Sequence, residues 1–354
     1  MKNLIFGLLS LSLFVPGTNP SAFAANFEAV PAGETQMIQD ILHTLKTQVR
    51  TEFMENGMAL RDAHAKQHGC VRADVSVLPR LSSSSQSSVF IPSQSYKVWI
   101  RYSNGSGKSQ DDSEGDGRGM AIKIIGAGDA GVQDILMINH PVFFVRNVKD
   151  YVDFTNAVAG GSPFKFFFNG LNPLNWRLHE AGIGKAIQGK KVTNPLGVQY
   201  WSMTPYLYGK SAAKFSARPC NTSEITDHST IGASFLRHNM AATLTKQDAC
   251  FILGAQFFVN QKITPIEDPT IEWKESQTPM IDLARITIPQ QKFTSEAQMD
   301  FCENISLSPW HYSADHRPLG GINRARRAIY DGISSLRHEL NGKNIPEVTG
   351  EEKF

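Results

Sequence analysis

A tyrosine and two arginines that share one face of a predicted helix could bind a metal. Residues 324–337 read Arg-Ala-Arg-Arg-Ala-Ile-Tyr-Asp-Gly-Ile-Ser-Ser-Leu-Arg. In a helix, Arg326 lies one turn before Tyr330 and Arg337 lies about two turns after it. A close guanidinium favours the ionised phenol, so Tyr330 could offer a phenolate oxygen to a metal such as haem iron. The alternative for this segment alone is a basic surface helix with one buried tyrosine.

A second group of polar side chains lies far upstream. Residues 61–66 read Arg-Asp-Ala-His-Ala-Lys, in which His64 could accept and return a proton near neutral pH. Three further segments follow in order: Val-Trp-Ile-Arg-Tyr-Ser-Asn-Gly at 98–105, Asp-Gly-Arg-Gly-Met-Ala-Ile-Lys at 116–123, and Pro-Val-Phe-Phe-Val-Arg at 141–146.

Taken together and in this order, these segments and the Arg-x-x-x-Tyr of residues 326–330 resemble the haem catalase family. The likeness covers roughly residues 45–340, and five ordered motifs are far more specific than one. Residues 266–273 resemble a further stretch near the end of the family's barrel. The resemblance implies an α+β fold: an antiparallel β-barrel of the catalase type with surrounding helices, and haem b between the barrel and the helices.

The resemblance implies an iron ligand and an acid–base group. Tyr330 matches the proximal ligand, Arg326 matches the arginine that stabilises its phenolate, and His64 matches the distal histidine. That histidine would carry the proton of a hydroperoxide to the leaving oxygen, so that the O–O bond breaks heterolytically and leaves an oxo-ferryl iron. The family's distal asparagine falls at Ile138, so Asn139 is the candidate for that catalytic role.

The resemblance also implies residues that hold the cofactor. Arg61, Arg101 and Arg337 match arginines on the haem propionates. Two carboxylates in a dry pocket need fixed, always-charged partners, which arginine provides. Taken singly, each arginine would be read as a surface ion-pair residue. Tyr151 stands where the family has an aromatic residue stacked on the haem.

The resemblance implies a haem-dependent, catalase-like peroxidase that reduces hydrogen peroxide or organic hydroperoxides with an unidentified electron donor. Ser216 stands where the family has a histidine and Gly320 where it has an aspartate, so a haem-binding protein with little turnover is a second hypothesis. A third is the rearrangement of fatty-acid hydroperoxides, as in allene oxide synthases. The aromatic run at 164–168 motivates it, because that run could line an apolar channel. The same run could instead be core or could contact a membrane surface.

Composition is typical of a sizeable globular protein. The 354 residues are 41% hydrophobic and 19% charged, and a net charge of +2 gives no support for nucleic-acid binding. Residues 1–24 have the features of a signal peptide, with Lys2 before an apolar stretch and Ala-Phe-Ala at 22–24. This predicts a periplasmic or secreted protein, and no later stretch is apolar enough to span a membrane.

The remaining chain is predicted to form a single haem domain at 25–345 and a flexible tail at 346–354. Four cysteines, with no Cys-x-x-Cys pair, predict one or two disulfides in an oxidising compartment: Cys70, Cys220, Cys250 and Cys302. Three full pairings remain possible, and the oligomeric state is left open.

Hydrophobic periodicity predicts the elements. Helical spacing predicts a helix over 34–53, and apolar alternation predicts short strands over 71–77, 89–91, 96–102, 120–125, 135–138 and 142–145. Glycines at 126, 128 and 131 spell a dinucleotide-binding pattern, but the short run that follows predicts a hairpin turn instead. His64 and His68 would share a helical face as a metal pair, but no further ligand nearby completes a set.

Overall fold

The computed structural model describes residues 27–222 and 225–354, so the predicted signal peptide at 1–24 lies outside them. The described residues form the strands β1 (Gln67–Val77), β2 (Ser95–Asn104), β3 (Arg118–Ile125), β4 (Val132–Ile138), β5 (Tyr200–Trp201), β6 (Tyr206–Tyr208), β7 (Ser211–Pro219), β8 (Ala249–Phe257) and β9 (Ile281–Ile288).

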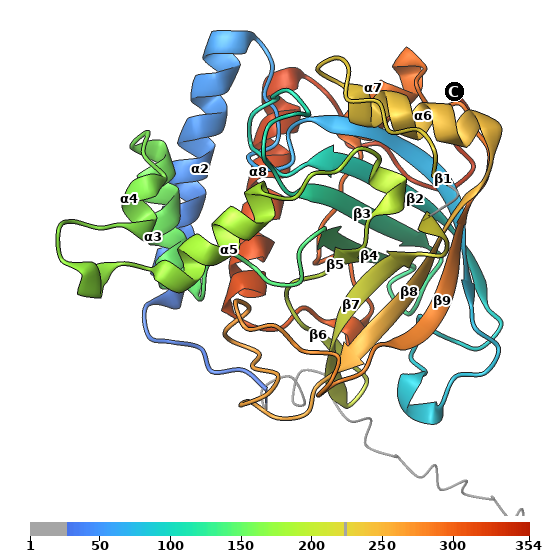
Figure 1. The fold of residues 1–354 in the computed structure, drawn as a ribbon, viewed down its shortest axis with the longest axis horizontal. Helices are drawn as coiled ribbons and strands as arrows, with labels where there is room; N and C mark the ends of the chain where they lie inside the picture. Colours follow the sequence, from blue (N-terminus) through green and yellow to red (C-terminus); the bar gives the residue numbers. More distant parts are fainter. Residues whose placement is uncertain (1–26, 223–224) are drawn as a thin grey trace, which may run out of the picture.

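Eight of these strands close an antiparallel barrel. Their order is β5-β4-β3-β2-β1-β9-β8-β7, and the ring closes because β5 pairs with both β4 and β7. The short β6 adds to β7 outside this ring. Alternate side chains fill the barrel, so Val71, Val75, Ile100 and Ile122 belong to one buried cluster. The predicted antiparallel barrel is therefore confirmed (Figure 1).

Two predicted strands are absent, and one predicted turn is confirmed. Residues 89–91 and 142–145 lie in loops without strand partners, although most of their apolar side chains are buried. Phe90, for example, is fully buried and its ring centroid lies 6.1 Å from that of Tyr208. Between β3 and β4, Gly126 N–H donates to the carbonyl of Gly131 at 2.8 Å, as expected of a hairpin.

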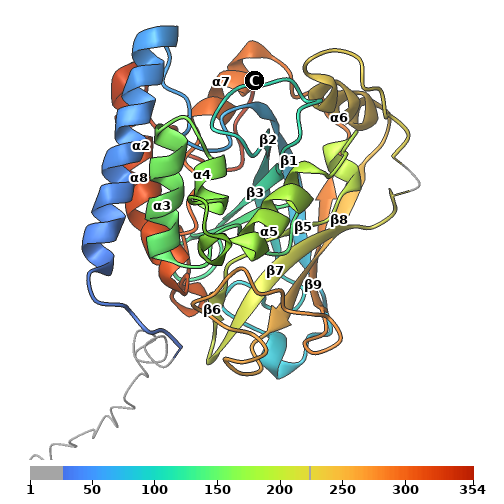
Figure 2. The ribbon, with the colours of Figure 1, turned by 60° about the vertical axis from the view of Figure 1, so that its left-hand side comes forward.

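Helices surround the barrel. They are α2 (Glu34–Asn56), α3 (Val148–Ala159), α4 (Phe164–Phe167), α5 (Leu178–Gln188), α6 (Phe235–Lys246), α7 (Glu296–Asn304) and α8 (Gly321–Asn341), with short 3-10 turns at Ser83–Ser85, Pro173–Asn175, Pro195–Gly197 and Ala314–His316. Both ribbon views place α2, α3 and α8 side by side on one flank of the barrel (Figures 1 and 2). None of the helices in the described ranges has the length and apolar character that crossing a bilayer requires.

An apolar seam holds α8 against α2. Ile41 and Val49 of α2 share a buried cluster with Ile329 and Ile333 of α8. The helices approach closely at Gly332, where a Cβ would come within 2.7 Å of a methyl of Leu42. On the same helix, Tyr330 packs against this cluster and Arg326 reaches Thr204 beyond β5.

All four cysteines are paired, as Cys70–Cys302 and Cys220–Cys250, with Cα atoms 5.3 and 5.5 Å apart. The first bond links β1 to α7. The C-terminal residues are also held, because Trp99 Nε1–H donates to Glu352 at 2.7 Å and the Phe354 ring lies 5.1 Å from that of Phe301. This packing differs from the flexible tail predicted at 346–354, since the apolar Phe354 finds an aromatic surface that the sequence pattern does not indicate.

Candidate active site

The helix α8 brings Arg326 and Tyr330 into contact. The Arg326 Nη2 donates to the Tyr330 hydroxyl at 3.2 Å, and its guanidinium carbon lies 5.2 Å from the ring centroid. Burial alone would lower the pKa of Arg326, but the phenols of Tyr330 and Tyr206 raise it above its ordinary value. The guanidinium is therefore a permanent cation beside the Tyr330 oxygen, as the helical spacing predicted.

Two residues that the sequence analysis missed hold Arg326 in place. Its Nη1 donates to Thr204 Oγ1 at 3.2 Å and to Asn323 Oδ1 at 3.1 Å, and the Thr204 hydroxyl donates to Asn323 at 3.0 Å. Thr204 follows a turn in which Met203 has a φ of 60°, a backbone conformation that non-glycine residues rarely adopt. Asn323 could have been found from its position one turn before Arg326, whereas Thr204 gives no local signal.

Arg326 stays hydrogen-bonded although Ser216 and Gly320 stand where the family pattern has a histidine and an aspartate. The Ser216 hydroxyl donates to the carbonyl of Tyr200 at 2.8 Å and accepts from Gln199 at 2.9 Å, so it serves the strand pairing. A Cβ at Gly320 would come within 2.5 Å of the carbonyl oxygen of Ile266, which leaves no space for an aspartate. Thr204 and Asn323 supply the hydrogen bonds instead.

His64 lies in the segment between α2 and β1 and is held by the start of the barrel. Its Nδ1 is 3.0 Å from Ser103 Oγ, its N–H donates to the carbonyl of Gly105, and its carbonyl accepts from Arg101 at 2.9 Å. The φ of His64 is 60°, a strained conformation that costs about 1–3 kcal/mol and is kept only where neighbours fix it. Burial, followed by the charge of Arg101, lowers the pKa of His64 to about 4, so the imidazole is neutral at pH 7.

A glycine on β3 leaves room for this histidine. A Cβ at Gly119 would lie 2.6 Å from both His64 Nδ1 and Ser103 Oγ, so a larger residue would displace the pair. The Arg-Gly-x-Ala-x-Lys motif therefore has a steric reason at this position. Ser103 belongs to another quoted motif, but its contact with His64 was not predicted.

Two arginines contact one carboxylate, and a third is close enough to feel their charge. Arg61 Nη1 lies 2.9 Å and Arg337 Nη1 lies 3.2 Å from the same Glu303 oxygen. Burial, and then the charges of Arg61 and Arg337, lower the pKa of the neighbouring Arg101 well below its ordinary value. The buried Nε of Arg101 has no hydrogen-bond partner among the described residues. An excess of buried positive charge and an orphaned donor fit an anionic group with carboxylates.

The two halves of the site act on each other electrostatically. The charge of Arg326 on α8 contributes to the lowered pKa of His64, and Tyr330 partly offsets the lowered pKa of Arg101. Burial, followed by Asp62 and Tyr330, raises the pKa of Tyr151 on α3. Electrostatic interactions therefore connect seven of the eight site residues predicted from the sequence: Arg61, His64, Arg101, Tyr151, Arg326, Tyr330 and Arg337.

Asn139 is placed differently. Its side-chain oxygen accepts from the backbone N–H of Arg118 at 2.7 Å, while its buried Nδ2 has no partner among the described residues. Ile138 belongs to an apolar cluster that also contacts Tyr151. A Cβ at Gly117 would lie 3.9 Å from both Asn139 Oδ1 and Ile138 Cδ1, so the two residues flank the same position. The distal role of Asn139 therefore stays a prediction.

The pair His64 and His68 does not lie on a helix. His68 lies within β1, and its Nε2 is 2.9 Å from Asn104 Oδ1 in a buried polar network. Within residues 27–222 and 225–354 no three His, Cys, Asp or Glu side chains come together as a possible metal-ion site. The oxygen of Tyr330 stays the predicted metal ligand, because a phenolate is a ligand that haem iron accepts.

Comparisons with known proteins give one family match and several similar folds. The family model for Catalase matches residues 19–162. Catalase-B of Dictyostelium discoideum is 25% identical over 371 residues, which cover 94% of this chain and 50% of that protein. The chain is therefore similar to the catalase family. It spans about half the length of this curated relative.

Solved catalases share the fold of this chain. A fungal catalase superposes with a TM-score of 0.63 at 16% identity, over 82% of this chain and 63% of its own. Catalase A from Saccharomyces cerevisiae gives a TM-score of 0.62 at 16% identity, over 82% and 62%. A bacterial catalase gives 0.60 at 16% identity, over 98% of this chain and 71% of its own.

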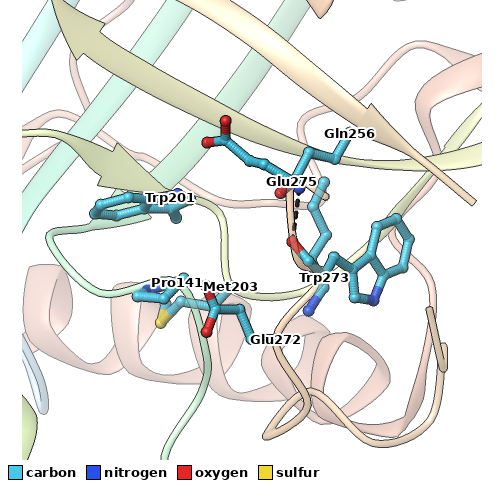
Figure 3. A pocket seen from close by; sticks show the side chains of 8 residues that line it. Pro141, Trp201, Met203, Gln256, Glu272, Trp273 and Glu275 are labelled. Atoms are coloured by element: carbon cyan, nitrogen blue, oxygen red, sulfur yellow. Dashed lines mark hydrogen bonds between the residues drawn. The ribbon is translucent and has the colours of Figure 1, made fainter. Parts of the chain in front are cut away.

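The chain also has a small pocket of about 60 Å³, shown in Figure 3. Its lining comes from loops and from the outer face of the barrel: Pro141, Trp201, Met203, Lys214, Gln256, Glu272, Trp273 and Glu275. Lys214 is buried, its Nζ lies 5.1 Å from the Trp273 ring centroid, and burial lowers its pKa to about 7. Met203 connects the pocket to the turn that positions Thr204.

Proposed function

We propose that this chain is a haem-dependent peroxidase of the catalase type that reduces hydrogen peroxide or organic hydroperoxides. One observation carries the proposal: Arg326 donates a hydrogen bond to the Tyr330 hydroxyl at 3.2 Å and is electrostatically coupled to a neutral His64. Similarity to the catalase family supports a peroxide as the substrate. The electron donor is unidentified.

Haem b is the cofactor that suits these residues. Tyr330 would hold the iron through its phenolate, with Arg326 balancing the negative charge. Arg61, Arg101 and Arg337 would hold the propionates, and Tyr151 would offer an aromatic contact. When bound, haem supplies the iron that binds the peroxide and the electrons that cleave the O–O bond.

His64 would move the proton. When its Nδ1–H donates to Ser103 Oγ, Nε2 carries no proton and can accept one from the hydroperoxide. The low pKa of His64 keeps this acceptor neutral, and the same nitrogen can return the proton to the leaving oxygen. The fixed backbone around His64 orients the ring before substrate arrives.

Peroxide consumption by His64→Ala tests the proposal. Loss of the acid–base group should lower kcat/KM for hydrogen peroxide by about 100-fold or more. His238→Ala, on the exposed face of α6, is the matched control and should behave as the wild type. Equal haem content by absorbance would show that the cofactor is retained. Equal, high turnover in His64→Ala would contradict the role of His64, whereas equally low turnover in both proteins would support a haem-binding protein with little turnover.

Rearrangement of fatty-acid hydroperoxides is a second candidate. It is favoured by the apolar cluster that includes Ile138, Phe143, Phe166 and Met203 and contacts Tyr151. Such a lining suits a long hydrocarbon chain. With a polyunsaturated hydroperoxide and no electron donor, epoxide or ketol products would support rearrangement. Formation of the alcohol, and only when a donor is added, would support the peroxidase.

We also infer that the protein works in the periplasm or outside the cell. Its two disulfides support this, because such bonds persist in oxidising compartments. Fractionation of the native host should recover the protein outside the cytoplasm, beginning near residue 25. Recovery with residues 1–24 attached in the cytosol would contradict the inference.

A further inference from the structure

An arm of residues 164–178 extends from the helical flank of the molecule. It contains α4, the turn at Pro173–Asn175 and the start of α5, and Figure 1 shows it reaching away from the barrel beyond α3. Leu171 is 99% exposed and Leu174 is 90% exposed. Phe164, Trp176 and Leu178 of the same arm are also exposed, at 66%, 38% and 62%.

The exposed apolar side chains are concentrated in this arm. It carries five of the fifteen large hydrophobic residues that are exposed in the described parts of the chain. Scattered single hydrophobics are ordinary on a protein surface, whereas a contiguous group marks a contact with a partner or a membrane. We therefore expect the apolar tip of the arm to contact a partner or a membrane.

Contacts within the arm hold this tip in shape. Phe168 and Trp176 form an antiparallel bridge, their rings lie 5.5 Å apart, and the Phe164 ring stacks 4.5 Å from that of Phe168. Trp176 Nε1–H donates to the carbonyl of Gly170 at 3.2 Å. At the base, Phe166 is buried in the apolar cluster beside the site. These internal contacts give the loop a defined shape, in which Leu171 and Leu174 are exposed to solvent.

The segment that carries the apolar tip has a net positive charge. Residues 160–191 contain five Lys or Arg and one Glu, a net charge of +4 (5 − 1), whereas the whole chain carries +2. Arg177 is paired with Asp150 and Asp153, but Lys165, Lys185 and Lys191 are exposed. This combination favours a negatively charged surface with an apolar interior.

A hollow next to the tip also combines positively charged and apolar side chains. Its volume is about 610 Å³. The lining combines cations, amides and apolar side chains from α3, α4 and the arm: Lys149, Asp153, Asn156, Ala157, Lys165, Phe166, Asn169, Leu174, Asn175, Trp176 and Arg177. Amide and ammonium donors beside Leu174 and Trp176 suit a phosphate headgroup whose acyl chains lie against the tip.

We propose that the arm docks on a lipid bilayer with anionic headgroups. Leu171 and Leu174 enter the acyl region, Trp176 lies at the headgroup level, where tryptophan is favoured, and Lys165 contacts the phosphates. A second copy of the chain is a poorer occupant, because a two-fold contact would place the same net-positive surface against itself. Docking through the arm does not depend on the proposed enzymatic function.

Vesicle sedimentation tests the docking. The wild-type protein should sediment with vesicles of phosphatidylglycerol and phosphatidylcholine at low salt, and much less with phosphatidylcholine alone. Leu171→Ser combined with Leu174→Ser should weaken binding at least tenfold. Ile231→Ser, which changes a residue that is 85% exposed elsewhere, should leave binding unchanged.

Three results would overturn the docking. They are the absence of wild-type sedimentation with anionic vesicles, unchanged binding by the double variant, and a wild-type dimer that the double variant converts to a monomer. The last outcome, from light scattering, would assign the arm to contact between copies.

The substrate class that follows from docking rests on the proposed function. Phe166 and Phe167 lead from the arm into the cluster that contacts Tyr151, so hydroperoxides of membrane lipids are the substrates we infer. The double variant should lose at least tenfold in rate on lipid hydroperoxide held in anionic vesicles and keep its rate on hydrogen peroxide. Equal loss on both substrates overturns this substrate class. No rate on either substrate in the wild type defeats the proposed function, while sedimentation still reports the docking.

Discussion

Thr204 and Asn323 give Arg326 neutral hydrogen-bond partners. Both lie within 3.2 Å of its Nη1, whereas the family pattern has a histidine and an aspartate in this support. A carboxylate would share the positive charge of the guanidinium, but a hydroxyl and an amide leave it for the Tyr330 oxygen. The altered support is therefore compatible with a phenolate ligand.

The pH dependence of peroxide consumption tests the state of His64. Burial lowers its pKa to about 4, so it is a neutral base above that pH and loses this role below it. We expect kcat/KM to stay nearly level from about pH 8 to about pH 5 and to fall near pH 4. Steady-state rates across this range provide the measurement. A fall centred near the ordinary histidine pKa of about 6.5 would contradict the buried state.

Replacing the buried Lys214 by an apolar residue should stabilise the folded protein by an amount that depends on pH. Burial lowers its pKa from 10.5 to about 7, so below pH 7 the folded protein holds a buried charge. Above pH 7 the folded state releases this proton while the unfolded chain keeps it, and the destabilisation declines toward pH 10.5.

We therefore expect Lys214→Met to raise the free energy of unfolding by about 2 kcal/mol more at pH 6 than at pH 9. Urea denaturation of both proteins at the two pH values gives the comparison. Lys165→Met, at an exposed position, is the control and should show no such difference. An equal gain at both pH values would mean that Lys214 titrates normally.

At the scale of elements, the site combines regular structure with strained loops. The spacing on α8 predicted the contact of Arg326 with Tyr330, because a helix fixes which residues share a face. Thr204 could not be predicted, since its role depends on a turn that meets α8 only in the folded chain. Glu303 was missed for the same reason, as it reaches Arg61 across 242 residues.

Apolar alternation predicted strands correctly where the segment pairs with a neighbouring strand. It correctly predicted the cores of β1 to β4, whose inward side chains fill the barrel. Alternation at 89–91 and 142–145 instead reflects loops that bury side chains against the barrel. Burial and strand pairing produce the same pattern over three or four residues, so sequence alone could not separate them.

The two disulfides should differ in their effect on stability. Cys70–Cys302 spans 232 residues and Cys220–Cys250 spans 30. In the chain-entropy description, loss of the longer link costs about 5 kcal/mol and loss of the shorter about 3–4 kcal/mol. Double Cys→Ser variants compared by urea denaturation provide the test. A larger loss for Cys220–Cys250 would show that loop entropy does not govern these bonds.

At the scale of the whole molecule, the active site joins two distant parts of the chain. His64 and Arg101 belong to the entrance of the barrel, while Arg326 and Tyr330 belong to the helical flank. Glu303 follows the disulfide-bonded Cys302 and binds arginines from both parts, Arg61 and Arg337. The barrel, the flank and this link together fix the distance between the acid–base group and the phenol.

The absorption spectrum of the purified protein tests this arrangement most directly. We expect a Soret band typical of ferric haem with a tyrosinate ligand in the wild type. The same band should appear in Tyr96→Phe, a control whose hydroxyl donates to Val89 on the barrel. In Tyr330→Phe the band should be lost or shifted, because the phenolate is removed. An unchanged band in Tyr330→Phe, or no haem in the wild type, would contradict the account.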